Sequence, residues 1–481
     1  MNSEYLYKVY ADGLPVKLDT IRVSAMPFNR IWPGKQRDIS QTEEAYVLHI
    51  VSEKSVHIKI ECENKELRPV IRPLSSQTHI EYNNNSAEFT LAEHGQYVFE
   101  PDGIHGTVHI FFDMPAGFEQ KKNADYVFEK GVYHAGKIEL KSGQSIYIGK
   151  EAHVYANICA FGQQNIKVFG YGVLDGGDEV RTYKHGDIGW DNENKFSPDK
   201  LHTVGCLRLF GCKNVEITGI RVQDSASYAM SFYACDGVHI DNVKAVGHWK
   251  YNNDGIDFIN CRNVLLENTF IRSFDDSVCV KGFTAFSDIS PENITVRNCV
   301  LWCGWGKTLE IGLATAAKSI SNITFSECKL VHNTTTCLAL SNGQYADVNG
   351  VLYENLEIEI EPTYEAPVYQ DSDSQVYRLS PKPFIPDLIN ITDSRRKWQG
   401  NISADDEKRC IRNIKYRNIR VAGSKEFVPV IRISRQNECG IFENISAENL
   451  NICGKDIPFL DFLKTHGCDD SVNIAKSGFR K

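Results

Sequence analysis

The sequence predicts an all-β protein, in which a right-handed parallel β-helix follows a small N-terminal β-sandwich. Three observations support this fold class. A short motif recurs beyond about residue 130, apolar residues alternate there with a period of two rather than 3.6, and the first 115 or so residues alternate without that repeat. We therefore expect a sandwich-like domain over 1–118 and a β-helix domain over 119–481.

The N-terminal part contains short strand-like runs separated by turn residues. Runs at 45–50, 56–60 and 108–112 alternate apolar and polar side chains, and no coil-length repeat accompanies them. Several short strands at close spacing are typical of a β-sandwich.

The repeat of the second part consists of Asn or Gly, a β-branched residue, a polar residue and a second β-branched residue. Copies begin at Asn214, Gly237, Asn263, Asn293 and Asn322, which are 23, 26, 30 and 29 residues apart. Further copies begin at Asn165, Asn413 and Asn444. Leucine-rich repeats would need Leu at fixed positions and helical repeats a 3.6-residue period, so stacked short strands fit best. Asn at each turn predicts ladders of stacked side-chain amides.

Cysteine is frequent, with fifteen residues and no CxxC pair. Cys212, Cys235 and Cys261 precede a repeat start by two residues, whereas Cys299 and Cys328 follow one by six. This register predicts reduced thiols stacked inside the coils as small hydrophobic side chains, and no zinc site.

Charge and hydropathy exclude several classes of protein. The formal net charge of −9 argues against a nucleic-acid binder. The sequence contains no apolar run of 18 residues, so we expect no membrane-spanning helix. The first twenty residues lack the features of a secretory signal, so we expect a cytoplasmic protein.

One segment interrupts the repeat. Residues 362–406 include five prolines and carry no copy of the motif, which predicts an excursion from one coil. Such a segment could wall a cleft or reach a neighbouring subunit, and whether the chain forms a homo-oligomer is left open.

An acidic cluster marks the candidate site. Asp254 and Asp257 precede the pair Asp275–Asp276 by about one coil, which predicts carboxylates stacked on adjacent coils. Stacked like charges repel and raise one another's pKa, which is costly for a scaffold but useful for acid–base chemistry. Aspartates that cap turns, or a Ca²⁺ site, remain alternative readings.

Several motifs resemble the polygalacturonase-type glycoside hydrolases of family 28, over roughly residues 125–470. They are Gly131–Val132–Tyr133 with 138–143, the GYGVLDG of 170–176, the DSA of 224–226, the NNDGID of 252–257, and Asp275–Asp276 with Val280–Lys281–Gly282. The resemblance implies an inverting hydrolase that needs neither cofactor nor metal. In that scheme Asp275 is the general acid, Asp254 and Asp276 hold and deprotonate water, and Asp257 orients its neighbours.

Two departures from the family pattern bear on the substrate. Lys307 stands where the family has a histidine, and the Arg-Ile-Lys that grips a galacturonate carboxylate is absent from 336–340. A uronate would need a cationic partner there, so we expect a neutral or mixed sugar. The pattern thus also resembles the β-helix glycosidases of families 49 and 110, and the former share a sandwich ahead of the helix.

Further residues near the acids are candidates for substrate binding. Glu310 is expected to hydrogen-bond sugar hydroxyls, and aromatic faces are expected to stack on sugar C–H surfaces. The candidate set is Asp257, Lys281, Lys307, Glu310, Trp305, Trp249, His248 and Tyr251.

The leading hypothesis is a glycosidase that acts on an oligosaccharide or on the end of a glycan. Alternatives are a hydrolase of pectic oligosaccharides, a Ca²⁺-dependent polysaccharide lyase, and a non-catalytic carbohydrate-binding β-helix.

Overall fold

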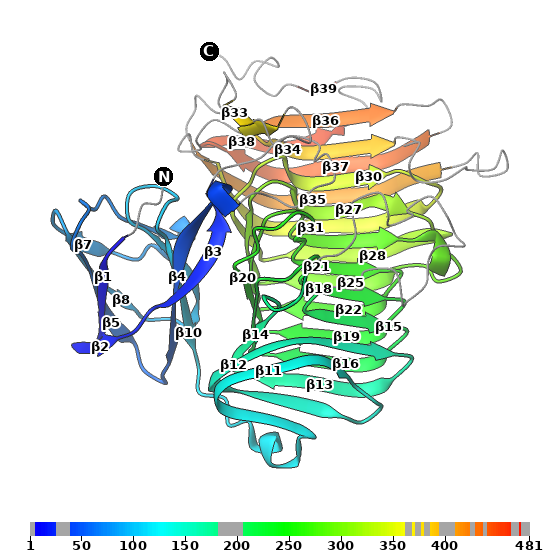
Figure 1. Ribbon diagram of the computed structural model, residues 1–481. Coiled ribbons are helices and arrows are strands. Elements are labelled where there is room, and N and C mark those ends of the chain that lie inside the picture. Colours follow the sequence, from blue (N-terminus) through cyan, green and yellow to red (C-terminus); the bar gives the residue numbers. More distant parts are fainter. Residues whose placement is uncertain are drawn as a thin grey trace.

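The fold is a parallel β-helix with a β-sandwich packed against its side (Figure 1). The computed structural model describes residues 5–25, 39–180, 205–360, 368–370, 377–379, 385–393, 409–423, 429–435, 440–462 and 471–472. Regular structure in these ranges is almost entirely β, and none of their helices is long and apolar enough to cross a membrane. The predicted fold class is confirmed.

Two five-stranded sheets form the sandwich, in the orders β2-β1-β5-β8-β7 and β3-β4-β10-β9-β6. Their strands are antiparallel except for the parallel pair of β4 and β10. The strands are β1 Tyr7–Ala11, β2 Leu14–Val16, β3 Asp19–Ser24, β4 Thr42–Val51, β5 Val56–Cys62, β6 Val70–Arg72, β7 Ile80–Tyr82, β8 Ser86–Leu91, β9 Gly95–Glu100 and β10 Val108–Asp113. Short 3₁₀ turns occur at η1 Ile39–Gln41, η2 Leu74–Ser76, η3 Glu119–Asn123 and η5 Thr284–Phe286.

The helix stacks its strands in three parallel columns. The site column contains β15, β18, β21, β24, β27 and β30, and the docking column contains β17, β20, β23, β26 and β29. The third column contains β13, β16, β19, β22, β25 and β28. Its register pairs Val215, Val238, Val264, Ile294 and Ile323 in turn, which matches the repeat spacing of the sequence.

The helix strands have the following bounds: β11 Tyr126–Glu139, β12 Ser145–Phe161, β13 Gln164–Gly170, β14 Val173–Asp175, β15 Leu207–Phe210, β16 Lys213–Thr218, β17 Arg221–Gln223, β18 Met230–Tyr233, β19 Asp236–Asp241, β20 Lys244–Val246, β21 Ile256–Ile259, β22 Arg262–Glu267, β23 Phe270–Ser273, β24 Val278–Gly282, β25 Glu292–Arg297, β26 Val300–Cys303, β27 Lys307–Thr315, β28 Ser319–Ser326, β29 Lys329–His332, β30 Thr336–Asn342 and β31 Asp347–Ile360. The later coils comprise β34 Asp387–Asp393, β35 Arg409–Gly423, β36 Val430–Arg435, β37 Gly440–Ile452, β38 Lys455–Asp461 and β39 Ser471–Val472.

The predicted excursion at 362–406 lies largely outside the described residues. Within it, β32 Val368–Gln370 and β33 Tyr377–Leu379 form an antiparallel pair. Asp387–Asp393 instead belongs to the helix, because β34 pairs in parallel with β30 and β36. The interruption therefore consists of two segments on either side of a regular coil strand.

Inward-facing aliphatic side chains and thiols fill the helix core. Cys212, Cys235 and Cys261 are buried in one cluster with Cys299 and Cys328, as their register predicts. The thirteen cysteines that the structure describes are free thiols. Each coil thus buries its apolar face on the next, and the solenoid needs no second core.

The predicted asparagine ladder is present at the start of the third-column strands, except at β19, where Gly237 occupies the position. The Asn322 amide donates to Asn293 (3.1 Å), and the Asn293 amide donates to Asn263 (3.0 Å). These residues have left-handed backbones, with φ of 57°, 56° and 53°. Asn tolerates this conformation, and its side-chain amide forms hydrogen bonds with the Asn side chains of the neighbouring coils. Both properties explain why Asn recurs at this position.

Replacement of Asn293 should separate these two contributions. We expect Asn293→Ala to destabilise the protein by about 1–3 kcal/mol, because it loses the ladder hydrogen bonds and strains a left-handed position. Asn293→Gly should cost less, since glycine adopts positive φ freely. Equilibrium unfolding in urea measures both, and equal losses would contradict a backbone contribution.

The second sandwich sheet packs on the docking column of the helix. Val23, Val47 and Phe111 of the sandwich share an apolar cluster with Phe270 and Trp302 of the helix. Buried charges cross the same interface: Arg72 pairs with Glu100 (2.9 Å) and with Glu359 of β31 (2.6 Å). The interface therefore fixes the sandwich against the helix (Figure 1).

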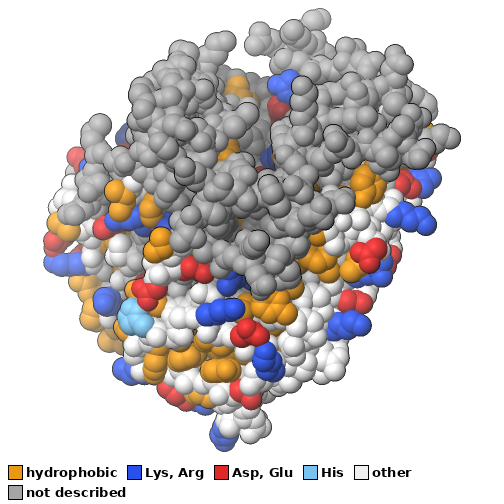
Figure 2. Space-filling model, turned by 45° about the vertical axis from the view of Figure 1, so that its right-hand side comes forward, with side chains coloured by type: hydrophobic (Ala, Val, Ile, Leu, Met, Phe, Trp, Pro, Cys, Tyr) orange, Lys and Arg blue, Asp and Glu red, His pale blue; other side chains and the backbone are white. Residues whose placement is uncertain are grey.

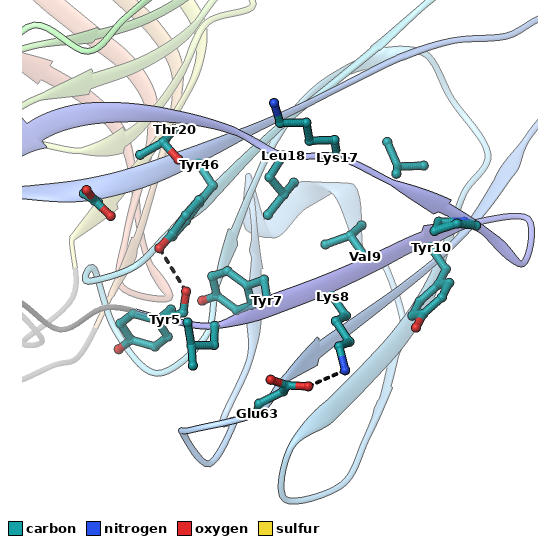
Figure 3. A pocket seen from close by; sticks show the side chains of 14 residues that line it. Tyr5, Tyr7, Lys8, Val9, Tyr10, Lys17, Leu18, Thr20, Tyr46 and Glu63 are labelled. Carbon is teal, nitrogen blue, oxygen red and sulfur yellow. Dashed lines mark hydrogen bonds and ion pairs between the residues drawn. The ribbon is translucent and has the colours of Figure 1, made fainter.

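The sandwich also carries a groove away from the acidic cluster (Figure 3). Its volume is about 720 Å³, and its lining includes Tyr5, Tyr7 and Tyr46. The Tyr46 hydroxyl donates to the Tyr5 carbonyl (2.9 Å), and the Tyr7 hydroxyl donates to the Gly106 carbonyl (2.8 Å). Main-chain partners thus already satisfy two of these hydroxyl groups.

Candidate active site

Asp254, Asp275 and Asp276 lie in the first two of three successive turns at one corner of the helix, and Asp257 and Glu310 lie on strands that follow these turns. Residues 247–255 join β20 to β21, 274–277 join β23 to β24, and 304–306 join β26 to β27. The strand register pairs Ile256 with Val278 and Val278 with Leu309. Two residues earlier, the same register sets Asp254, Asp276 and Lys307 beside one another, as the spacing of the aspartates predicts.

Glycines allow these turns to approach closely. A Cβ on Gly306 would lie 2.4 Å from the backbone nitrogen of Asp276 and 2.5 Å from its Oδ1. A Cβ on Gly255 would lie 2.5 Å from the Ser277 carbonyl oxygen. The backbone therefore brings successive turns into contact around Asp276, and any side chain at either glycine would force them apart.

Asn253, at the position where the family motif has threonine, holds the first turn in place. Its amide donates to the carbonyls of Ser225 (2.9 Å) and Ser227 (2.7 Å), and its Oδ1 accepts from the Lys250 backbone (2.8 Å). The side chain is fully buried. Asn253 thus supplies the local support that orients Asp254.

Lys281 neutralises part of the acidic cluster. Its ammonium lies 2.9 Å from Asp254 Oδ2 and 2.5 Å from Asp257 Oδ1. Burial, followed by its acidic neighbours, still raises the pKa of Asp254 well above the usual range, and burial raises the pKa of Asp257 to about 6. Lys281 therefore acts on Asp254 through ion pairing and Asp257 acts on it through charge repulsion, and the predicted contact of both residues with substrate stays a prediction.

Asp275 and Asp276 occupy different electrostatic environments although they are adjacent. Burial, and then the charge of Asp276, raises the pKa of Asp275 well above its usual range. Burial would also raise the pKa of Asp276, but Lys307, Lys281 and hydrogen bonds hold it below that range. Asp276 Oδ1 accepts the Lys307 backbone N–H (2.8 Å), and Asp275 Oδ1 accepts the Asp276 backbone N–H (3.0 Å). One carboxyl group is thus poised to hold a proton and the other to remain ionised.

Glu310 lies behind Asp276 and is completely buried. Its Oε1 pairs with the Lys307 ammonium (2.7 Å). The Cys279 thiol lies 3.5 Å from Asp276 Oδ2 and 3.9 Å from Glu310 Oε2. The Glu310 carboxyl group thus faces other protein groups, and its predicted hydrogen bonds to sugar hydroxyls stay a prediction.

Aromatic side chains flank the acids. Trp305 is half-buried and stacks on Phe274 (ring centroids 5.7 Å apart, 18° between planes). Its ring also contacts the buried Tyr251 at a centroid distance of 5.5 Å. Trp305 is the more exposed of these rings and therefore the better candidate to meet a sugar face.

The other residues of the first turn pack more deeply. Trp249 is nearly buried and donates its indole N–H to Asp224 Oδ1 (3.0 Å), and Lys250 pairs with the same oxygen (2.8 Å). His248 is 2% exposed, and burial lowers its pKa to about 3. The roles of His248 and Trp249 in substrate binding stay predictions.

Sequence reasoning missed Cys279, Phe274 and Lys250 as members of this site. Cys279 lies between the Asp275–Asp276 pair and Lys281 on an outward-facing strand position, which is the one signal that could have identified it. Its register partners on the neighbouring coils are Asp257 and Glu310. The thiol therefore lies inside a column of carboxyl groups.

The donor set fits a hard metal ion poorly. Two groups have atoms within 4.8 Å of one another, namely Asp254, Asp257 and Cys279, and Asp276, Cys279 and Glu310. Ca²⁺ takes about six to eight oxygen ligands, whereas each group offers two carboxylates and a thiol beside a lysine ammonium. We derive no step through a metal.

Comparisons with known proteins agree with this arrangement. The model of glycosyl hydrolases family 28 matches residues 119–427. The chain is 26% identical over 171 residues to a probable endopolygalacturonase D of Neosartorya fischeri, covering 35% of this chain and 32% of the relative. It is 25% identical over 243 residues to an endo-polygalacturonase of Pectobacterium carotovorum subsp. carotovorum, covering 49% and 57%. The matched segments thus span less than two thirds of these relatives.

The fold as a whole has a solved counterpart. Dex49A from Penicillium minioluteum superposes with a TM-score of 0.61 at 14% identity, covering 94% of this chain and 89% of Dex49A. This likeness shows that the two proteins share the fold. Since the family model spans most of the β-helix and the acidic motifs lie within it, the chain belongs to glycosyl hydrolases family 28.

Proposed function

We propose that the protein is an inverting glycoside hydrolase that cleaves an oligosaccharide or the end of a glycan. The observation that carries this proposal is the arrangement of Asp254, Asp275 and Asp276 on adjacent turns, where Asp276 accepts the Lys307 backbone N–H (2.8 Å) and Asp275 accepts that of Asp276 (3.0 Å). Asp275 donates its proton to the glycosidic oxygen, and Asp254 and Asp276 hold the attacking water, which the ionised Asp276 deprotonates.

A neutral or mixed sugar is the proposed substrate class. A uronate at the cleavage point needs a cation that is not already neutralised. Lys281 pairs with Asp254 and Asp257, and the charge of Lys307 is balanced chiefly by Asp276, although its ammonium also contacts Glu310. The strand position of the family's Arg-Ile-Lys is occupied by Thr336–Leu340, whose side chains are buried and uncharged.

Hydrolysis of a pectic oligosaccharide is the second candidate. It is favoured by the curated relatives, which are named as polygalacturonases, and by the proximity of Lys307 to Asp276. In this reading the Lys307 ammonium would contact a uronate carboxylate in place of Glu310.

A substrate screen distinguishes these candidates. The protein is incubated with aryl α- and β-glycosides of neutral sugars, with neutral oligosaccharides and with galacturonate oligosaccharides, and NMR identifies the anomer released first. We expect turnover of a neutral glycoside with inversion at the anomeric carbon. Turnover of galacturonate oligomers alone would favour the second candidate, and retention would exclude the inverting mechanism. An unsaturated uronate product would indicate a lyase.

A further inference from the structure

We propose that Glu310 is a positioning residue for Asp276: its carboxyl group keeps a proton and donates it to the Asp276 carboxylate. This hydrogen bond holds Asp276 ionised and fixes its orientation toward the attacking water. The inference rests on the proposed function, in which Asp276 acts as a base.

The carboxyl groups of Asp276 and Glu310 lie close together. Carboxyl oxygens of Asp276 and Glu310 and the Cys279 Sγ lie within 4.8 Å of one another, and all three side chains are buried. Two buried carboxylates that face each other at this range repel strongly when both are ionised. A shared proton converts that repulsion into a charge-assisted hydrogen bond.

The acids of the site outnumber its bases. The described site holds five carboxyl groups and two ammonium groups, namely Asp254, Asp257, Asp275, Asp276 and Glu310 with Lys281 and Lys307. Leaving three uncompensated charges in a buried cluster is expensive, so some of these acids must be protonated. The groups that face Glu310 are Asp276, Cys279, Lys281 and Lys307, with the Tyr353 hydroxyl of β31 at longer range.

The contacts of the two carboxyl groups differ, and they favour the proton on Glu310. Asp276 accepts the Lys307 backbone N–H and faces the Cys279 thiol, and both contacts favour its ionised form. Glu310 Oε1 pairs with the Lys307 ammonium, and its Oε2 receives only the longer Cys279 contact of 3.9 Å. Burial, and then the charge of Asp276, raises the pKa of Glu310 to about 8 against the opposing effect of Lys307. The proton therefore resides on Glu310 at neutral pH.

A spectroscopic test needs no substrate. The infrared difference between wild type and Glu310→Gln at about pH 6 should show the loss of one protonated-carboxyl C=O stretch. Glu267→Gln is the matched control, because Glu267 also lies on a helix strand and His239 and Arg297 hold its pKa below the usual range against the effect of burial. The control should lose no such band. An unchanged band in Glu310→Gln, or a stoichiometric metal ion in the purified protein, would overturn the proposal.

A kinetic test uses the best glycoside from the screen. Glu310→Gln keeps an N–H donor toward Asp276 and should retain most of the wild-type kcat/KM. Glu310→Ala should lose about 10- to 100-fold, and the acidic limb of its pH profile should move to higher pH, because Asp276 loses a hydrogen-bond donor. Equal losses in both variants, or an unmoved limb in Glu310→Ala, would indicate a merely structural role. If the Glu310 variants gave one of these contrary results while Asp275→Asn was inactive, the role of Glu310 would be wrong and the hydrolase proposal would stand.

Discussion

The Asp275→Asn variant is expected to lose about 10³-fold or more of the wild-type kcat while its fold and substrate binding survive. Asparagine matches the shape of the protonated aspartic acid and accepts the same backbone N–H of Asp276. It has no proton to give to the departing glycosidic oxygen. The measurement is kcat on the best glycoside of the screen, with far-UV circular dichroism to verify the fold.

The leaving group gives this prediction a sharper form. A good leaving group, such as fluoride or dinitrophenolate, departs without protonation, so its glycosides depend little on a general acid. We therefore expect Asp275→Asn to lose far less activity on such substrates than on alkyl glycosides. An equal loss on both would assign Asp275 a role other than proton donation.

The same substitution should change stability in a defined direction. Because the pKa of Asp275 is raised in the folded state, its stabilising contribution is complete below the unfolded pKa and declines as pH rises through the folded pKa. Asparagine does not ionise, so Asp275→Asn should gain stability relative to wild type as pH increases from about 4 toward 8. Urea midpoints across this range measure the difference.

A matched aspartate provides the control. Asp236 lies on the helix at a turn of the third column, where its carboxylate accepts the Asn263 amide (2.7 Å). Asp236→Asn keeps a carbonyl acceptor for this hydrogen bond and should leave kcat unchanged. If Asp275→Asn kept more than about a tenth of the wild-type kcat, the general-acid assignment would be wrong.

The β-helix was predictable because its information is local and repeated. Each copy of the motif places Asn or Gly at a left-handed turn and apolar, mostly β-branched residues toward the core, so spacing alone gives the coil length. The same spacing placed Asp254 beside Asp276. Each residue precedes the first residue of its coil's next strand by two positions, so the two lie at the same corner of adjacent coils. Repetition made both inferences independent of distant parts of the chain.

The surroundings of the acids were less predictable. The surroundings of Glu310 depend on which outward-facing residue of the neighbouring coil lies beside it. The register of β24 and β27 places Cys279 there, next to Asp276. The sequence also gave no sign that Arg72 of the sandwich would meet Glu359, because 287 positions separate them and no repeat links them. Non-local contacts of this kind need the packed structure.

That contact carries the second large prediction. Arg72 is 1% exposed, and its guanidinium pairs with Glu100 and Glu359, which are also buried. Glu100 further pairs with His332 of β29, so the network joins sandwich and helix. Removing one member of a buried ion pair leaves its partners charged and desolvated, so Arg72→Ala should destabilise the protein by about 3–5 kcal/mol.

The neighbouring Arg68 is the matched control. It pairs with Asp102 at 2.8 Å, but its side chain is 79% exposed. Water screens such a pair, and Arg68→Ala should change the unfolding midpoint little. The comparison isolates burial, because both variants remove an arginine–carboxylate contact from the same part of the sandwich.

The pH dependence identifies the cause of the loss. Burial already raises the pKa of Glu359 to about 7 although Arg72 opposes the shift. Without Arg72 the folded state holds a proton on Glu359 that the unfolded chain releases, so the stability of Arg72→Ala should fall as pH rises from about 5 to 8, more steeply than that of wild type. A triple variant, Arg72→Met with Glu100→Gln and Glu359→Gln, should recover most of the loss, since it leaves no charge behind. If the triple variant were as unstable as Arg72→Ala, lost packing rather than uncompensated charge would explain the effect, and the network would serve to fill space between sandwich and helix.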